Sequence, residues 1–223
     1  SIKGKQIYDM FIGTRDVVIE NNTIIAFGHS RIFENKTSQN LGVSTENYNS
    51  INITIRNNDI VTDNVLCYFN VAETSIIELV SNTITFISTK APLIVLHNGC
   101  DITISQNSIY YQSANTSACI DIGKDYEDRS TSIRKLTITD NILYNGSPAQ
   151  FLVVRESHIN TLLFRNNIVD DGYVLFQARN GSTIDTLTFA HLQPRFTSFP
   201  LQTLDGSSIE TLVLEIPNIA GTR

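Results

Sequence analysis

Short aliphatic runs interrupted by a single Asn recur along the whole chain. The recurring pattern is an apolar residue, two residues of mixed character, an Asn, one further residue and an aliphatic residue. It occurs at 19–24, 55–60, 79–84, 104–109, 138–143 and 164–169, with Asn22, Asn58, Asn82, Asn107, Asn141 and Asn167. Two degenerate copies follow, at 189–193 with Leu192 in the Asn position and at 214–219 with Pro217. Repetition at a fixed period predicts a repeat architecture.

The spacing of the copies predicts where the loops lie. Successive copies are 36, 24, 25, 34, 26, 25 and 25 residues apart, so a period near 25 is stretched twice. An insertion of that size in a fixed period is a loop on one corner of a repeat. We therefore expect loop insertions near 28–50 and 123–132.

Each period also contains a second strand-like run. Such runs lie at 93–97, 119–123, 151–155, 173–179 and 200–205. Strands this short cannot bury a face alone, whereas stacked coils bury a continuous column of Ile, Leu and Val. The sequence predicts an all-β fold, a single parallel β-helix (solenoid) of about eight coils in one domain spanning 1–223. Residues 1–15 are expected to form a lead-in or an incomplete coil, and the chain is open to being a piece of a longer protein.

Two properties of Asn suit it to a repeated corner. Asn tolerates the left-handed backbone region better than most residues. Its amide both donates and accepts hydrogen bonds, so a stacked column of Asn can bridge neighbouring coils. Asn-rich surface turns of a β-sandwich are the alternative, but a sandwich has turns about every 8–12 residues without one repeated corner. The six copies therefore predict an Asn ladder.

Composition and charge narrow the class of protein. Hydrophobic residues make up 41% of the 223 residues, which is enough for a sizeable core. The net charge of −6 with no basic run argues against a nucleic-acid partner. No apolar run approaches the roughly 20 residues that cross a membrane, so no membrane insertion is expected. No signal peptide is visible, and the opening SIKGKQIYDM suggests a mature or trimmed form.

The cysteines do not form a recognisable framework. Cys67, Cys100 and Cys119 are an odd, sparse set without the spacing of zinc ligands. We expect them to pack as small buried apolar residues, and we expect no metal and no cofactor.

On this repeat the chain resembles the right-handed parallel β-helices of the pectate-lyase-like superfamily, from about Val17 to Ile219. In that family the Asn ladder lies in the second turn of each coil. The resemblance implies that 136–139 is a second strand and that 119–123 is a first strand. It also implies that carbohydrate lies along the first-strand face and the turn that follows it.

Polar side chains are expected to stack along this first-strand face. Alignment of the strand ends gives one column of Ala72, His97, Gly123, Arg155, Arg179 and Asp205. Two residues earlier lie Asn70, Val95, Asp121, Val153, Gln177 and Thr203. Because neighbouring strands are about 4.8 Å apart, His97, Asp121, Arg155 and Arg179 are predicted to form one polar strip.

Two mechanisms could use such a strip. Glycoside hydrolysis needs two carboxyl groups, about 5 Å or 6.5–9.5 Å apart. Asp121 could supply one of them, with Asp125, Glu127 or Glu156 as the other. Elimination from a uronic acid instead needs a base and a group that neutralises the sugar carboxylate. His97 or Arg155 together with Arg179 fits those roles.

The preferred assignment takes Asp121 as acid or base with His97 and Arg155 as its partners. The expected substrate contacts are Arg179, Gln177, Asp125, Tyr126, Asp128 and Glu156. A solvated face with incidental salt bridges is the alternative, because outward charges are expected on any β-helix. Tyr110 and Tyr144 share one offset after their ladder Asn, so they are expected to stack, either as a platform for sugar rings or as a plain aromatic pair.

Within the superfamily, the Asn/Ser/Thr-rich repeat is similar in style to bacteriophage tailspikes. Motifs typical of polygalacturonases, pectate lyases and secreted epimerases are not recognisable in this chain. The resemblance implies a homotrimer, outside the cell or on a virion, that binds and depolymerises a bacterial surface polysaccharide. A secreted monomeric lyase or glycoside hydrolase and a non-catalytic adhesin or spike fragment remain as alternatives.

Overall fold

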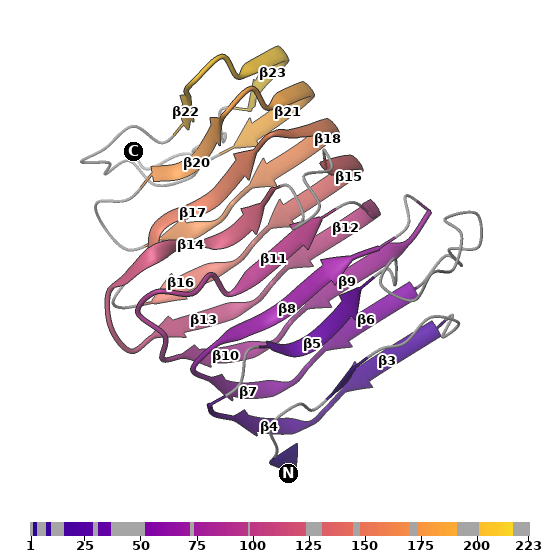
Figure 1. Ribbon diagram of the computed structural model, residues 1–223, viewed down its shortest axis with the longest axis vertical. Coiled ribbons are helices and arrows are strands. Elements are labelled where there is room, and N and C mark those ends of the chain that lie inside the picture. Colours follow the sequence, from indigo (N-terminus) through magenta and orange to yellow (C-terminus); the bar gives the residue numbers. More distant parts are fainter. Residues whose placement is uncertain are drawn as a thin grey trace, which may run out of the picture.

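The strands of the computed structural model stack in parallel, coil upon coil, into a β-solenoid (Figure 1). The structure describes residues 2–3, 8–9, 16–28, 31–36, 52–71, 74–97, 99–123, 131–144, 148–169, 174–190 and 201–215. These residues contain strands and turns but no helix, and hence no helix long and apolar enough to cross a membrane. All strand pairs among them are parallel, which excludes the antiparallel β-sandwich.

The strands form three sheets. Sheet A contains β1 (Ile2–Lys3), β4 (Thr23–Ala26), β7 (Asp59–Thr62), β10 (Thr83–Phe86), β13 (Ser108–Tyr111), β16 (Ile142–Tyr144) and β19 (Ile168–Val169). Sheet B contains β2 (Tyr8–Asp9), β5 (Arg31–Lys36), β8 (Val65–Asn70), β11 (Ile94–His97), β14 (Asn115–Ile122), β17 (Pro148–Arg155), β20 (Val174–Arg179) and β22 (Leu201–Thr203). Sheet C contains β3 (Asp16–Glu20), β6 (Asn52–Arg56), β9 (Ile76–Val80), β12 (Gly99–Ser105), β15 (Thr131–Thr139), β18 (Ser157–Arg165), β21 (Thr183–Ala190) and β23 (Ser208–Glu215).

Each coil visits sheet C, then sheet A, then sheet B. The Asn corner lies between sheets C and A, and the short aliphatic pair that follows each Asn is the sheet A strand. The two longest links from sheet B to sheet C span 37–51 and 124–130, and both lie outside the described residues. The loop expected near 28–50 began too early, because 31–36 is strand β5. In the N-terminal lead-in, β1 pairs with β4 and β2 pairs with β5.

The regular part of the solenoid has about five coils, and the predicted count of eight was too high. The five coils from β6 to β20 each have one strand in every sheet. The level formed by β3, β4 and β5 is separated from them by residues 37–51, and the described residues after β20 include no sheet A strand. The prediction counted this first level and the two degenerate copies as full coils.

The core is a set of columns that run along the solenoid. One column passes through Ile55, Leu79, Ile104, Ile138 and Phe164, which are register partners on successive sheet C strands. All five side chains are buried. Their neighbours in sequence alternate with them and are less buried, because successive side chains of a strand point to opposite faces. A shift of one residue would turn this column to the outer face, so its burial specifies the strand register.

The six predicted Asn residues form a continuous hydrogen-bonded ladder. From Asn22 to Asn167, the Nδ2 of each Asn donates to the Oδ1 of the next, over 3.3, 3.0, 3.0, 2.9 and 2.9 Å. The backbone N–H of each Asn donates to the same Oδ1 atom, over 3.0–3.2 Å. Since all but Asn22 are buried, the ladder satisfies backbone groups that water cannot reach.

At each corner the residue with a left-handed backbone is the one before the ladder Asn. The expectation that the ladder Asn itself adopts this conformation was therefore wrong. Positive φ angles of 53–57° occur at Asn21, Asn57, Ser81, Gln106, Asp140 and Asn166. These positions hold several residue types, so the tolerance of Asn for this region does not explain the repeat. The ladder Asn is selected by its amide hydrogen bonds alone.

This geometry predicts the effect of a substitution at an exposed corner. Gln106 adopts φ 57°, a conformation that costs an L-residue about 1–2 kcal/mol and costs Gly almost nothing. We expect Gln106→Gly to raise the free energy of unfolding by about 0.5–1 kcal/mol in urea titrations. Gln112→Gly is the matched control at a position without positive φ, and it should lower stability. If Gln106→Gly lowers the free energy of unfolding as much as Gln112→Gly does, positive φ at the corner is not a source of strain.

Two of the cysteines are packing residues, as predicted. Cys67 and Cys119 are free and buried. Burial raises the pKa of both thiols, that of Cys119 to about 12. Neither is therefore a thiolate near neutral pH. The side chain of Cys100 lies outside the described residues.

Candidate functional site

The outer face of sheet B carries the predicted polar strip. Arg155 is in register with Arg179, and Asp121 is in register with Val95 and Val153. The His97 ring and the Gly123 carbonyl meet on neighbouring strands. These pairings confirm the centre of both predicted columns.

The ends of the predicted columns were wrong. His97 pairs with Asn70 and not with Ala72, and Val95 pairs with Tyr68. At the other end, Gln177 pairs with Gln202 and not with Thr203. The predicted columns were obtained by aligning the last residues of the strands. The actual register is set by the inward-facing aliphatic residues. Because the strands end at different distances from these residues, the predicted partners are wrong by one or two positions.

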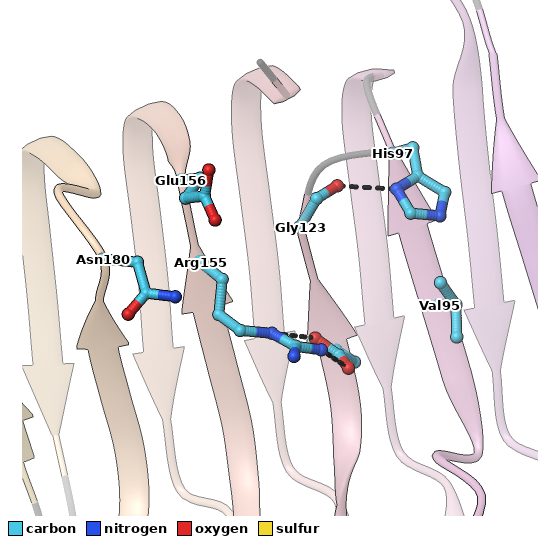
Figure 2. Close-up of a pocket in the computed structure, with 7 residues that line it drawn as sticks. Val95, His97, Gly123, Arg155, Glu156 and Asn180 are labelled. Carbon is cyan, nitrogen blue, oxygen red and sulfur yellow. Dashed lines mark hydrogen bonds and ion pairs between the residues drawn. The ribbon is translucent and has the colours of Figure 1, made fainter. Parts of the chain in front are cut away.

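A hollow of about 240 Å³ opens on this face, at the corner that leads from sheet B to sheet C (Figure 2). Its lining residues are Val95, His97, Asp121, Gly123, Arg155, Glu156 and Asn180. Gly123 lies between His97 and Arg155 and has no side chain, which leaves the space open. A Cβ at this position would be 3.7 Å from the Cβ of Arg155, an ordinary contact.

Arg155 and Asp121 form a two-point ion pair across the hollow. Arg155 Nε donates to Asp121 Oδ1 over 3.1 Å, and its NH2 nitrogen contacts the other carboxylate oxygen. The two residues are diagonal neighbours on β17 and β14, because Asp121 is the register partner of Val153. Because the guanidinium engages both oxygens and favours the charged form of a carboxylate, Asp121 is arranged as a proton acceptor more than as a donor.

The surroundings of Arg155 disfavour the charged form of its guanidinium group. Its side chain is 37% exposed. Burial and then the positive charge of Arg179 lower the pKa of Arg155, while Glu156 acts in the opposite direction. The site thus places two guanidinium groups side by side on one face.

His97 is held in one orientation. Its Nδ1 lies 2.6 Å from the carbonyl oxygen of Gly123, which can only accept, so Nδ1 carries a proton and a neutral ring has the Nδ1–H tautomer. The ring also lies 4.9 Å from that of Tyr68, whose face is covered by the guanidinium of Arg31 at 3.5 Å. The aromatic contact extends the strip towards the N-terminus.

Asn180 and a column of hydroxyl residues were missed by the sequence analysis. Thr131, Ser157 and Ser182 donate to the carbonyl oxygens of Gly123, Arg155 and Arg179, over 2.5, 2.6 and 2.8 Å. The backbone N–H groups of Ser157 and Ser182 in turn donate to the hydroxyl groups of Ser182 and Ser207. This column fixes the corner where the strip ends. Its spacing of 26, 25 and 25 residues was visible in the sequence, but Ser and Thr are too common for it to stand out.

The other predicted site residues fall into three groups. Gln177 is buried on β20, and its Nε2 donates to Gln202 Oε1 over 3.0 Å. Glu156 lines the hollow in a left-handed turn, with φ 49°. Asp125, Tyr126 and Asp128 lie outside the described residues.

Two further features bear on binding. Tyr110 and Tyr144 stack as expected, with ring centroids 4.5 Å apart, but they lie on sheet A and not beside the hollow. Within the described part of the chain, no group of three or more His, Cys, Asp or Glu side chains could hold a metal ion.

The hollow is lined by two carboxylates, one imidazole and one guanidinium group, and a second guanidinium group, that of Arg179, lies on the strand next to Arg155. Such a set can bind hydroxyl and acidic groups of a sugar through charge-assisted hydrogen bonds. It can also transfer protons through Asp121, Glu156 or His97. Comparison with protein-family profiles, curated proteins and solved structures finds no match to this chain.

Proposed function

We propose that the chain binds a bacterial surface polysaccharide along the outer face of sheet B and depolymerises it at the hollow, within a tailspike-like assembly. One observation carries this proposal: polar side chains of successive coils line a single open hollow on a rigid solenoid. A face that repeats once per coil suits a ligand that also repeats. We also propose that the solenoid is a right-handed parallel β-helix of the pectate-lyase-like type, in which the strands of sheet B are the first strands of the coils.

The chemistry that fits best is glycoside hydrolysis with Asp121 and Glu156 as the carboxyl pair. Both residues line the hollow. The contact with Arg155 favours the charged form of Asp121, so Asp121 takes the role of base or nucleophile and Glu156 is the second carboxyl group of the pair. Elimination from a uronic acid is the second candidate, because Arg155 and Arg179 can neutralise a sugar carboxylate close to His97.

A substitution that fills the hollow tests the binding face. Gly123 has no positive φ and a Cβ there would meet only ordinary contacts, so the backbone accepts a side chain at this position. We expect Gly123→Leu to keep the circular dichroism spectrum of the wild type. Its side chain would occupy the hollow, and we expect at least about a tenfold loss of affinity, roughly 1.4 kcal/mol, for any polysaccharide that binds. Binding is measured by calorimetry over a panel of bacterial capsular and O-chain polysaccharides.

Thr137→Leu is the matched control, because it adds the same side chain to the outer face of sheet C. It should leave binding unchanged. The same incubations are read for new reducing ends and for the absorbance of unsaturated uronate. New reducing ends without the absorbance indicate hydrolysis, and both signals together indicate elimination. If a polymer binds but gives neither signal, the chain is a non-catalytic adhesin. Equal binding by the wild type and Gly123→Leu would overturn the proposal.

The assembly state belongs to the same proposal. A tailspike-like protein outside the cell or on a virion is a homotrimer, and closed symmetric assemblies of this kind have self-complementary or ring-forming contacts. Sedimentation equilibrium should give three times the 24.9 kDa chain mass. A monomer with depolymerase activity would favour the secreted enzyme instead.

A further inference from the structure

Two arginines stand side by side at one end of the strip. Arg155 on β17 and Arg179 on β20 are register partners on adjacent strands, with both side chains on the outer face of sheet B. The hydroxyl groups of Ser157 and Ser182 hold the carbonyl groups of these two residues. Like charges directly opposite each other on neighbouring strands destabilise a sheet. The pair is therefore costly in the absence of a neutralising group.

Only one of the two arginines is neutralised within the described residues. Asp121 binds Arg155, and the charge of Glu156 also acts on Arg155. Arg179 has no ion pair in the described part of the chain, and its Nε atom is buried there without a hydrogen-bond partner. An unpaired buried donor on a charged group costs more than one on a neutral group. Among the described residues, Arg179 thus has no anionic partner.

We propose that Arg179 and Arg155 together bind the carboxylate of an acidic sugar residue, so that the polysaccharide recognised on sheet B is an anionic one. This inference rests on the proposed function, because it names the chemical class of the polymer bound at the same site. It reaches beyond that function because glycoside hydrolysis, the reaction that fits the hollow best, does not require an acidic sugar.

The donors present match a carboxylate. A guanidinium has five N–H donors in a planar fork, and a carboxylate accepts two parallel hydrogen bonds from it. Asp121 takes donors from Nε and one terminal nitrogen of Arg155, which leaves the other terminal nitrogen for a ligand. Asn180 follows Arg179 directly and adds an amide at the edge of the hollow (Figure 2).

The test uses sodium glucuronate, glucose and glucose 1-phosphate as probes, titrated against the full chain with isotope-labelled arginine. The NMR signals of the arginine Nε–H groups report which side chain meets the ligand. Glucuronate should shift the signals of Arg155 and Arg179, and glucose should not. Arg179→Gln should weaken glucuronate binding at least about tenfold, as expected for the loss of a two-point charged contact.

Arg134→Gln is the matched control, because it removes one exposed arginine from sheet C. It should bind glucuronate as the wild type does. Equal shifts from glucose and glucuronate, no shift at either arginine, or unaltered binding by Arg179→Gln would each overturn the proposal. Binding of glucose 1-phosphate without binding of glucuronate would also overturn it, since the acidic group would then be a phosphate.

A polymer experiment separates this inference from the function on which it rests. An acidic polysaccharide that binds is compared with the same polymer after chemical reduction of its carboxyl groups to alcohols. Loss of affinity on reduction supports the inference. Equal affinity for both forms, with Gly123→Leu still impaired, overturns the acidic-sugar inference and leaves the function standing. If no polymer binds, the function fails, and the glucuronate titration alone decides whether the anion site exists.

Discussion

Replacing the central ladder residue Asn107 by Ala should lower the free energy of unfolding by about 3–5 kcal/mol. The side chain is fully buried. Its Nδ2 donates to Leu79 O over 2.8 Å, and its Oδ1 accepts from the backbone N–H of Asn82 over 3.0 Å. Both backbone groups lose their partner in the variant, and each buried unpaired group costs about 1–3 kcal/mol. Because the chain has no Trp, unfolding in urea is best followed by far-ultraviolet circular dichroism.

Asn22→Ala is the control for the ladder. Asn22 occupies the N-terminal end of the ladder, is only half-buried, and bonds Glu20 O where solvent has access. Its loss should cost about 1 kcal/mol or less, because water replaces the missing partner. If Asn107→Ala costs no more than Asn22→Ala, the ladder is a by-product of the fold and does not stabilise it.

Replacing Phe164 by Ala should cost a similar amount, about 3–5 kcal/mol, for a different reason. Phe164 is fully buried, stacked on Phe189 with centroids 5.6 Å apart, and edge-on to Phe151 at 5.5 Å. Ala leaves a cavity in a column whose neighbours are fixed by three sheets and cannot collapse into it. The same urea titration measures the loss.

Leu214→Ala is the control for Phe164→Ala, because it lies in the same column at the end that is exposed to solvent. Leu214 is the register partner of Phe189 on β23, yet it is 63% exposed. We expect a change within about 0.5 kcal/mol, as for other surface substitutions. A large loss at Leu214, or a small one at Phe164, would show that the column is not the source of stability.

The sequence predicted the class of fold because the ladder requires one residue type at one offset. No other side chain of that size both accepts from two N–H groups and donates to a carbonyl and to the next Asn, so the six copies stand out. The left-handed corner was placed one residue too late because several residue types tolerate that backbone, as Ser81 and Gln106 show. Coil number was overestimated because the first level and the two degenerate copies were counted as full coils.

The candidate site was predicted in its centre and missed at its edges. His97, Asp121, Arg155 and Arg179 share one face because strands of the same period stack in register. The ion pair between Asp121 and Arg155 was not predicted, since it joins diagonal neighbours on adjacent strands and not register partners. Asn180 was missed because it lies in the turn after β20. The repeat pattern predicts which residues of a strand face outward, but it does not predict where a side chain in a turn points.

The most direct test of the central claim is a crystal structure of the chain with an oligosaccharide cut from a polysaccharide that binds. We expect the sugar chain to cross the outer face of sheet B, to cover the hollow and to contact Arg155 and Asn180. A sugar chain bound on sheet A beside Tyr110 and Tyr144, or on the outer face of sheet C, would contradict it.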